Sequence, residues 1–209
     1  MHINEFRHDE ANSRSQRGTD LRLLLAQPTD KQQRPCPGCD ILCSCQKSSR
    51  TCCCNCSPAC PQVMHNLSSE PQEHPIEPNV LPLVYSMNVV RVIQPCWSCE
   101  GHMQDDGQEI HKLPEVWFYS SSVVYPELLA QHLTQLRTGK DLSAPWQVTL
   151  APYSADNSTA MFIVKPELLP ESSSQVLSRL QRDLHRIANA LPNQLGRLAH
   201  AMLEQLEAA

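Results

Sequence analysis

Two cysteines and two histidines with the spacing of metal ligands lie close together between residues 95 and 111, in the run PCWSCEGHMQDDGQEIH. Two residues separate the cysteines, and this spacing lets both thiolates reach one ion from a tight turn. Zinc prefers four sulfur or nitrogen ligands arranged as a tetrahedron, and the two histidines follow within reach. The sequence therefore predicts a zinc site formed by Cys96, Cys99, His102 and His111.

The rest of this loop suits a bound cation. Asp106-Gly107 is the strongest turn dipeptide of the chain, because glycine accepts a positive φ, and a turn there folds His111 back toward the cysteines. Nearby acidic residues add negative charge that favours a cation and can orient a histidine: Glu100, Asp105, Asp106 and Glu109. The alternative interpretation is two reduced, buried cysteines and two solvated histidines.

The same loop also admits a catalytic interpretation. Two cysteines and one histidine would leave the fourth zinc position to water, with Glu100 or Glu109 as the base, as in a metal-dependent hydrolase or deaminase. Zinc deaminases carry P-C-x-x-C downstream of H-x-E, and Pro95 begins a match to the first of these motifs. The run from His74 to Glu77 departs from the second motif, because it is one residue too long and contains a proline.

A second group of cysteines lies upstream, between residues 36 and 60, without any aromatic residue. Its nine members are Cys36, Cys39, Cys43, Cys45, Cys52, Cys53, Cys54, Cys56 and Cys60. In composition this stretch resembles metallothioneins, which fold around several soft metal ions, and thiolates select Zn(II) or Cu(I). Thiolate metal storage is one hypothesis for this segment. An inert tail is the other, and an iron–sulfur cluster also stays open.

Composition divides the 209 residues into four segments. Residues 1–35 are polar and charged, which is typical of a disordered tail. Residues 36–60 form the Cys-rich segment, and residues 61–82 contain five prolines and predict a linker. Hydrophobic periodicity typical of a folded domain begins at residue 83, so we expect one domain over 83–209 that carries the 95–111 loop.

The pattern within 83–209 predicts an α+β fold in which a small, mostly antiparallel sheet packs on two to three helices. The expected element order is β-β-α-β-β-α-α. We expect strands at 83–93, 116–120, 146–150 and 160–165, a helix at 126–138, and two C-terminal helices separated by Pro192.

Charge and hydropathy narrow the range of functions that we expect for this protein. A net charge of −5 argues against a general nucleic-acid binder, which needs a basic face. No apolar run approaches the roughly 18–20 residues of a membrane-spanning helix, so we expect no membrane association and a cytoplasmic location. The leading hypothesis is a non-enzymatic, zinc-binding interaction or regulatory protein whose metal loop meets a protein partner.

Overall fold

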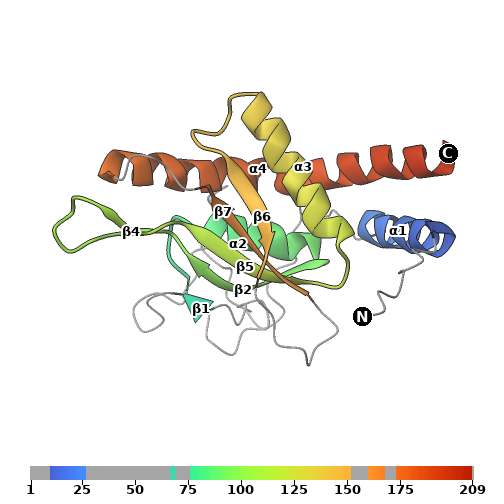
Figure 1. Cartoon of the computed structure of the whole chain (residues 1–209), viewed down its shortest axis with the longest axis horizontal. Coiled ribbons are helices and arrows are strands. Elements are labelled where there is room, and N and C mark those ends of the chain that lie inside the picture. The colour runs from blue at the N-terminus through green and yellow to red at the C-terminus, as the bar shows by residue number, and fades with distance from the viewer. Residues whose placement is uncertain (1–9, 27–66, 69–75, 152–159, 168–172, 209) are drawn as a thin grey trace, which may run out of the picture.

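The computed structural model describes residues 10–26, 67–68, 76–151, 160–167 and 173–208 (Figure 1). Within these residues, four helices and seven strands form an α+β fold, which confirms the predicted fold class. In chain order the elements are α1 (Glu10–Leu25), β1 (Leu67–Ser68), α2 (Leu81–Val90), β2 (Ile93–Cys99), β3 (His102–Met103), β4 (Ile110–Lys112), β5 (Glu115–Ser120), α3 (Val124–Thr138), β6 (Trp146–Leu150), β7 (Ala160–Pro166) and α4 (Ser174–Ala208).

The main sheet has the strand order β1-β2-β5-β7-β6. Strands β2, β5, β7 and β6 pair antiparallel, and only the short β1 runs parallel to its neighbour β2. Alternate residues of β5 are buried (Val116, Phe118 and Ser120), as expected for a strand with one face on a core. Strands β3 and β4 form a separate two-stranded hairpin, the β3–β4 hairpin, which extends from the body of the molecule (Figure 1).

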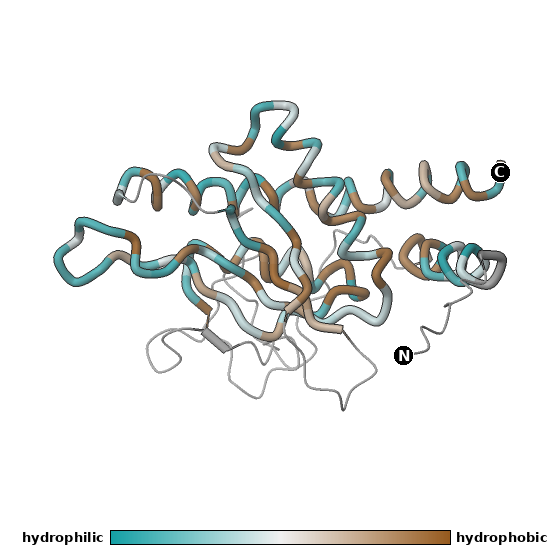
Figure 2. Tube along the Cα trace, in the orientation of Figure 1, coloured by the Kyte–Doolittle hydropathy of each residue, from teal (hydrophilic) through white to brown (hydrophobic). Residues whose placement is uncertain are grey.

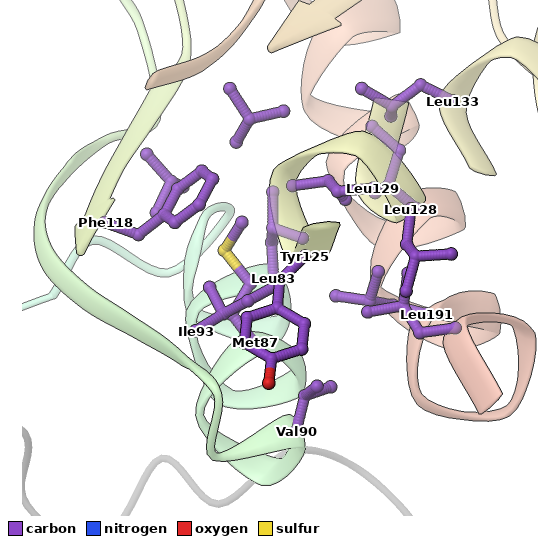
Figure 3. Packing of buried hydrophobic residues seen from close by; sticks show 14 of the residues in the cluster. Leu83, Met87, Val90, Ile93, Phe118, Tyr125, Leu128, Leu129, Leu133 and Leu191 are labelled. Carbon is purple, nitrogen blue, oxygen red and sulfur yellow. The ribbon is translucent and has the colours of Figure 1, made fainter. Parts of the chain in front are cut away.

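Side chains from the sheet and from all four described helices share one core. Figure 3 shows Phe118 of β5 facing Met87 of α2 and Leu129 of α3, with Leu191 of α4 on the far side. These residues are fully buried or nearly so. Helix α4 contacts α1, α2 and α3. Its residues alternate between hydrophobic and hydrophilic along the helix, as an element with one buried face requires (Figure 2).

The strand predicted at 83–93 is wrong, because most of this run forms helix α2 and the strand begins only at Ile93. Its buried residues, Leu83, Val84, Met87 and Val90, recur on one face of a helix, and that face packs on α4. Pro82 sits in the first helical turn, where its missing N–H costs nothing. Packing therefore overrides the strand preference of the β-branched residues.

The predicted break at Pro192 is also wrong, since α4 is one helix of 35 residues with this proline inside it. A proline removes the hydrogen bond to the carbonyl four residues earlier, which here belongs to Ala188. The Ser86 hydroxyl of α2 donates to that carbonyl at 2.9 Å and replaces the lost donor. The apolar stripe then continues without interruption to Leu195 and Ala199.

Helix α1 lies within residues 1–35, the segment whose composition is typical of a disordered tail. Its Leu21 is fully buried and belongs to the common core. Arg17 binds the Glu127 carboxylate of α3 at 2.6 and 2.7 Å. The Tyr125 hydroxyl donates to the Asp20 carbonyl at 3.0 Å, and burial, together with the nearby Asp20 charge, raises the pKa of Tyr125 to about 12. These contacts with distant residues attach α1 to the domain, and local composition cannot reveal them.

His132 of α3 is buried against α4. Its side chain is 1% exposed, and its Nε2 lies 3.4 Å from the Ile187 carbonyl. Among the described residues, no group bonds its Nδ1. Burial lowers the pKa of His132, and the Ile187 carbonyl only partly offsets this effect. The native protein therefore favours the neutral imidazole.

This burial predicts that stability falls on acidification. Below the ordinary histidine pKa of about 6.5 the unfolded chain binds a proton that native His132 resists, so the free energy of unfolding declines, by at most about 1.4 kcal/mol per pH unit for one group. Urea unfolding of the wild type and of His132→Leu between pH 7.5 and pH 5 checks this, and the variant is expected to lose less stability over that interval. Equal losses in the two proteins would contradict the role of His132.

Candidate metal centre

Three side chains of metal-binding type meet beside the start of α2. Glu77 lies in the turn before α2, Cys99 ends β2 and His102 begins β3. One ligand atom from each, a carboxylate oxygen, a thiol sulfur and an imidazole nitrogen, lie within 4.8 Å of one another. Glu77 Oε1 and His102 Nε2 lie 3.0 Å apart. We call these three residues the Glu-Cys-His group.

Two reciprocal hydrogen bonds hold the segments that carry this group. The Glu100 backbone N–H donates to Glu77 Oε2 at 2.7 Å, and the Asn79 backbone N–H donates to Glu100 Oε2, also at 2.7 Å. From α4, Gln181 Nε2 donates to the Glu100 carbonyl at 3.3 Å. Charge-assisted bonds to backbone amides are among the stronger hydrogen bonds of a protein. They fix the Glu77 carboxylate next to the end of β2.

A glycine makes the turn between Cys99 and His102 feasible. Gly101 has φ +87°, a backbone conformation that residues with a side chain rarely adopt. Its N–H donates to Cys99 Sγ at 3.4 Å. A Cβ at this position would lie 2.6 Å from Leu177 Cδ1 and 2.9 Å from the Pro114 ring. Gly101 therefore serves two needs at once, namely the reversal of the chain and its close approach to α4.

Two side chains of the Glu-Cys-His group are buried, and the third is partly exposed. Cys99 is 0% exposed, Glu77 is 2% exposed and the His102 side chain is 27% exposed. Carboxylate, thiolate and imidazole are all zinc ligands, and tetrahedral zinc with bonds of about 2.0–2.3 Å holds its ligand atoms roughly 3.3–3.8 Å apart. Side-chain adjustments of about 1 Å would bring these atoms to that spacing. The group can thus supply three ligands to one ion.

The structure brings Cys99 and His102 together but leaves Cys96 outside the group. Cys96 lies within strand β2, where the register shifts between Pro95 and Trp97, and burial raises the pKa of its thiol while a backbone bond from Trp97 lowers it in part. A strand advances about 3.3 Å per residue, so three steps separate the Cα atoms of the two cysteines by about 10 Å. The C-x-x-C spacing therefore lies in an extended segment and not in a tight turn.

His111 also lies outside the group, although the hairpin turn forms at Asp106-Gly107 as expected. In the β3–β4 hairpin, His102 pairs with Lys112 and Met103 pairs with Ile110. His111 is the extra residue of the bulge between these pairs, and its side chain is exposed. It lines a surface hollow with Met103, Gln104, Asp105 and Asp106.

Glu77 is the residue that the predicted four-ligand site lacks, since sequence reasoning considers the run from His74 to Glu77 only as an imperfect match to the deaminase motif. It lies in the Pro-rich segment 61–82, which the composition assigns to a linker, and a single glutamate there resembles its neighbours Glu70 and Glu73. The proline of the first α2 turn is a further local signal, because it marks the end of that linker. The nine cysteines between residues 36 and 60 lie outside the described residues.

Comparisons with known proteins supply no family. No protein-family model, curated protein or solved structure matches this chain. Of the helices that the structure describes, none is both long enough and apolar enough to cross a bilayer. A functional interpretation therefore depends on the chemistry of the side chains themselves.

The turn at Gly101 predicts an unusually costly alanine substitution. Gly101→Ala combines a positive φ with overlap against Leu177 and Pro114, so we expect a loss of about 2–4 kcal/mol in the free energy of unfolding. Gly107→Ala is the matched control, because Gly107 has φ +68° but a Cβ added there would meet nothing within 4 Å, and it should lose only about 1 kcal/mol. Urea unfolding measures both losses, and equal losses would refute the packing role of Gly101.

Proposed function

We propose that this protein binds one zinc ion through Glu77, Cys99 and His102, and that the ion fixes the β3–β4 hairpin for contact with a protein partner. The observation that supports zinc is the donor set, because a buried carboxylate, a buried thiol and a partly exposed imidazole from three segments converge within 4.8 Å. A carboxylate and a thiolate so close together repel each other, and a divalent cation converts this repulsion into attraction.

Three protein ligands leave one position of a tetrahedral zinc ion to water or to a donor atom from another molecule. A catalytic role would need a free base beside that position. The Glu100 carboxylate already accepts the Asn79 N–H at 2.7 Å. Glu109 is exposed on the hairpin, beyond His102. These placements favour a structural or regulatory role for the ion over hydrolysis or deamination.

The hairpin that follows His102 is suited to contact a partner. Residues 104–109 are all exposed, and Figure 2 shows this part of the chain as hydrophilic. His102 is the first residue of the hairpin and its cross-strand neighbour Lys112 is the last, so a metal bond at His102 holds the base of the hairpin. Metal occupancy would then control how rigidly the base of the hairpin is held for contact with a partner.

A matched set of variants tests the ligands. Because the nine cysteines between residues 36 and 60 can bind metal themselves, the variants are made in the full chain with these nine changed to serine. We expect about one zinc per chain in this background, lost in Cys99→Ser and in His102→Ala. Elemental analysis after dialysis measures the zinc content.

The controls are Cys96→Ser and His111→Ala, which remove the same residue types outside the Glu-Cys-His group. They are expected to retain the ion. Zinc loss in both controls would instead favour the four-ligand site predicted from spacing, and a zinc-free background protein would reject the proposal. The difference in metal content between the wild type and the background also measures how much metal the Cys-rich segment stores.

The effect on the hairpin can be followed by hydrogen exchange. Removing zinc with a chelator should speed amide exchange in residues 102–112 by at least about tenfold, because the base of the hairpin loses its anchor. Amides of β5 and β7, which pair with each other in the centre of the sheet, should exchange as before. His102→Ala should show the fast exchange without chelator. A uniform change over the whole domain would contradict a local role for the ion.

A further inference from the structure

One exposed face of α4 is polar over most of its length. Residues that recur every three or four positions along it are all exposed, namely Arg179, Arg182, Arg186, Asn189, Asn193, Arg197 and His200. This spacing places them on one side of the helix, away from the apolar face that packs with α1, α2 and α3. We call these seven residues the donor stripe, because each side chain can donate hydrogen bonds through N–H groups. The stripe extends over about 32 Å of helix.

The exposed charges along the donor stripe are all positive. Residues 174–203 contain four arginines and a single acidic residue, Asp183, whose side chain is 0% exposed. Among the described residues, no hydrogen bond or ion pair engages the side chains of Arg179, Arg182 and Arg197. Glu204 lies one turn beyond His200 and ends the stripe. This face of α4 is therefore a positive surface.

The net charge of the chain does not reveal this surface. A value of −5 argues against a general nucleic-acid binder, but it is a sum over all residues. At physiological ionic strength, salt screens the interaction between exposed charges that lie more than about 8 Å apart. The charges on one face therefore decide which partner that face attracts.

The loop after α3 orients the middle of the donor stripe. Arg186 Nη1 donates to the Asp141 carbonyl at 2.6 Å and lies 3.4 Å from the Asp183 carboxylate, while its side chain stays 52% exposed. Lys140 and Asp141 are both exposed on this flank, and their charges are opposite. The flank therefore adds little net charge, and the guanidinium groups dominate the surface.

The types of side chain in the stripe favour a nucleic-acid duplex as the partner. All four cations are arginines, whose planar guanidinium binds a phosphate through two parallel hydrogen bonds. A helix that binds an anionic membrane surface needs apolar side chains beside its cations, and none of the seven is apolar. Proteins that bind single strands stack the bases on aromatic side chains, and the stripe contains no Phe, Tyr or Trp.

We propose that α4 binds duplex DNA, with the donor stripe in the major groove. An α-helix fits this groove, which is about 12 Å wide. The three arginines before Asn189 would contact phosphates on one side of the groove and Arg197 those on the other, because about 17 Å of helix separates Arg197 from Arg186. The asparagines lie between these cations and would face the base edges, where asparagine can pair with adenine. The major groove of an RNA duplex is too narrow to admit the helix.

Binding of a fluorescently labelled DNA duplex of about 24 base pairs to the full chain tests the proposal. Under reducing conditions at about 50 mM salt, anisotropy should show a Kd of about 1–100 µM. A plot of the logarithm of the association constant against that of the salt concentration should have a slope of about −3 to −4, because four arginines displace counterions.

Two variants place the DNA on the donor stripe. The double substitution Arg179→Gln and Arg182→Gln should weaken binding at least tenfold and make the salt slope less negative by about 2. Asn193→Glu, which puts an acid in the middle of the stripe, should also weaken binding at least tenfold. All three side chains are exposed, so the thermal unfolding midpoint of both variants should equal that of the wild type.

The matched control is Arg14→Gln with Arg91→Gln, which removes the same charge from exposed positions on α1 and after α2. It should bind DNA like the wild type. An RNA duplex of the same sequence should bind at least tenfold more weakly than the DNA. Four outcomes would each overturn the proposal: no binding at about 200 µM protein, an equal loss of affinity in the control, equal affinity for the RNA duplex, or polyglutamate that competes as well as unlabelled DNA.

Discussion

The apolar face of α4 is the constraint on which the rest of the structure depends. Three other helices pack on it, and α2, α3 and α1 have few other surfaces that could bury their own apolar residues. A helix of 35 residues extends about 50 Å, so its two ends lie in different parts of the molecule. The end near residue 181 supports the metal centre, and the end near residue 207 packs beside α1. Because α4 continues through Pro192, one helix can both support the metal centre and pack beside α1.

Buried polar groups join the elements at defined points along this face. The Asp183 carboxylate of α4 is 0% exposed, and it accepts from the Ser143 N–H and hydroxyl and from the Trp146 indole. Ser86 satisfies the carbonyl that Pro192 leaves free. Glu77 and Glu100 fix the turn before α2 to the end of β2. Each bond specifies a position, because an unpaired buried polar group would cost about 1–3 kcal/mol.

Sequence reasoning succeeds where a segment's own pattern decides its structure. Strands β5, β6 and β7 and helix α3 follow from alternation or helical spacing, and the hairpin turn follows from Asp106-Gly107. It fails where a contact with a residue far away in the sequence decides the structure of a segment. The β-branched run at 83–93 becomes helical because α4 supplies the matching face, and Pro192 is tolerated because Ser86, on a different helix, replaces the missing donor. Composition likewise cannot foresee that Leu21 enters the core.

Prediction of the candidate site from the sequence succeeds and fails for the same reason. Cysteine and histidine spacing draws attention to the right loop, and Cys99 and His102 do converge there. Spacing cannot indicate that β2 extends through Cys96 or that a bulge places His111 outside the group, because both depend on pairing with other strands. Nor can it find Glu77, which reaches the site through a hydrogen bond to the backbone of Glu100.

The position of the Glu-Cys-His group also bears on what a bound ion would contribute. Many small zinc domains lack a core and fold only around their metal. Here the core contains side chains from α1, α2, α3, α4 and the sheet, and the segments that carry the ligands are already held by hydrogen bonds among Glu77, Asn79 and Glu100. The free energy of metal binding would therefore not be needed to form the domain. It would instead stabilise the β3–β4 hairpin, which lies outside the core. This hairpin begins at His102 and extends away from the body of the molecule (Figure 1). A metal centre placed between a stable core and a projecting hairpin is suited to control a surface, whereas one placed within the core would control folding.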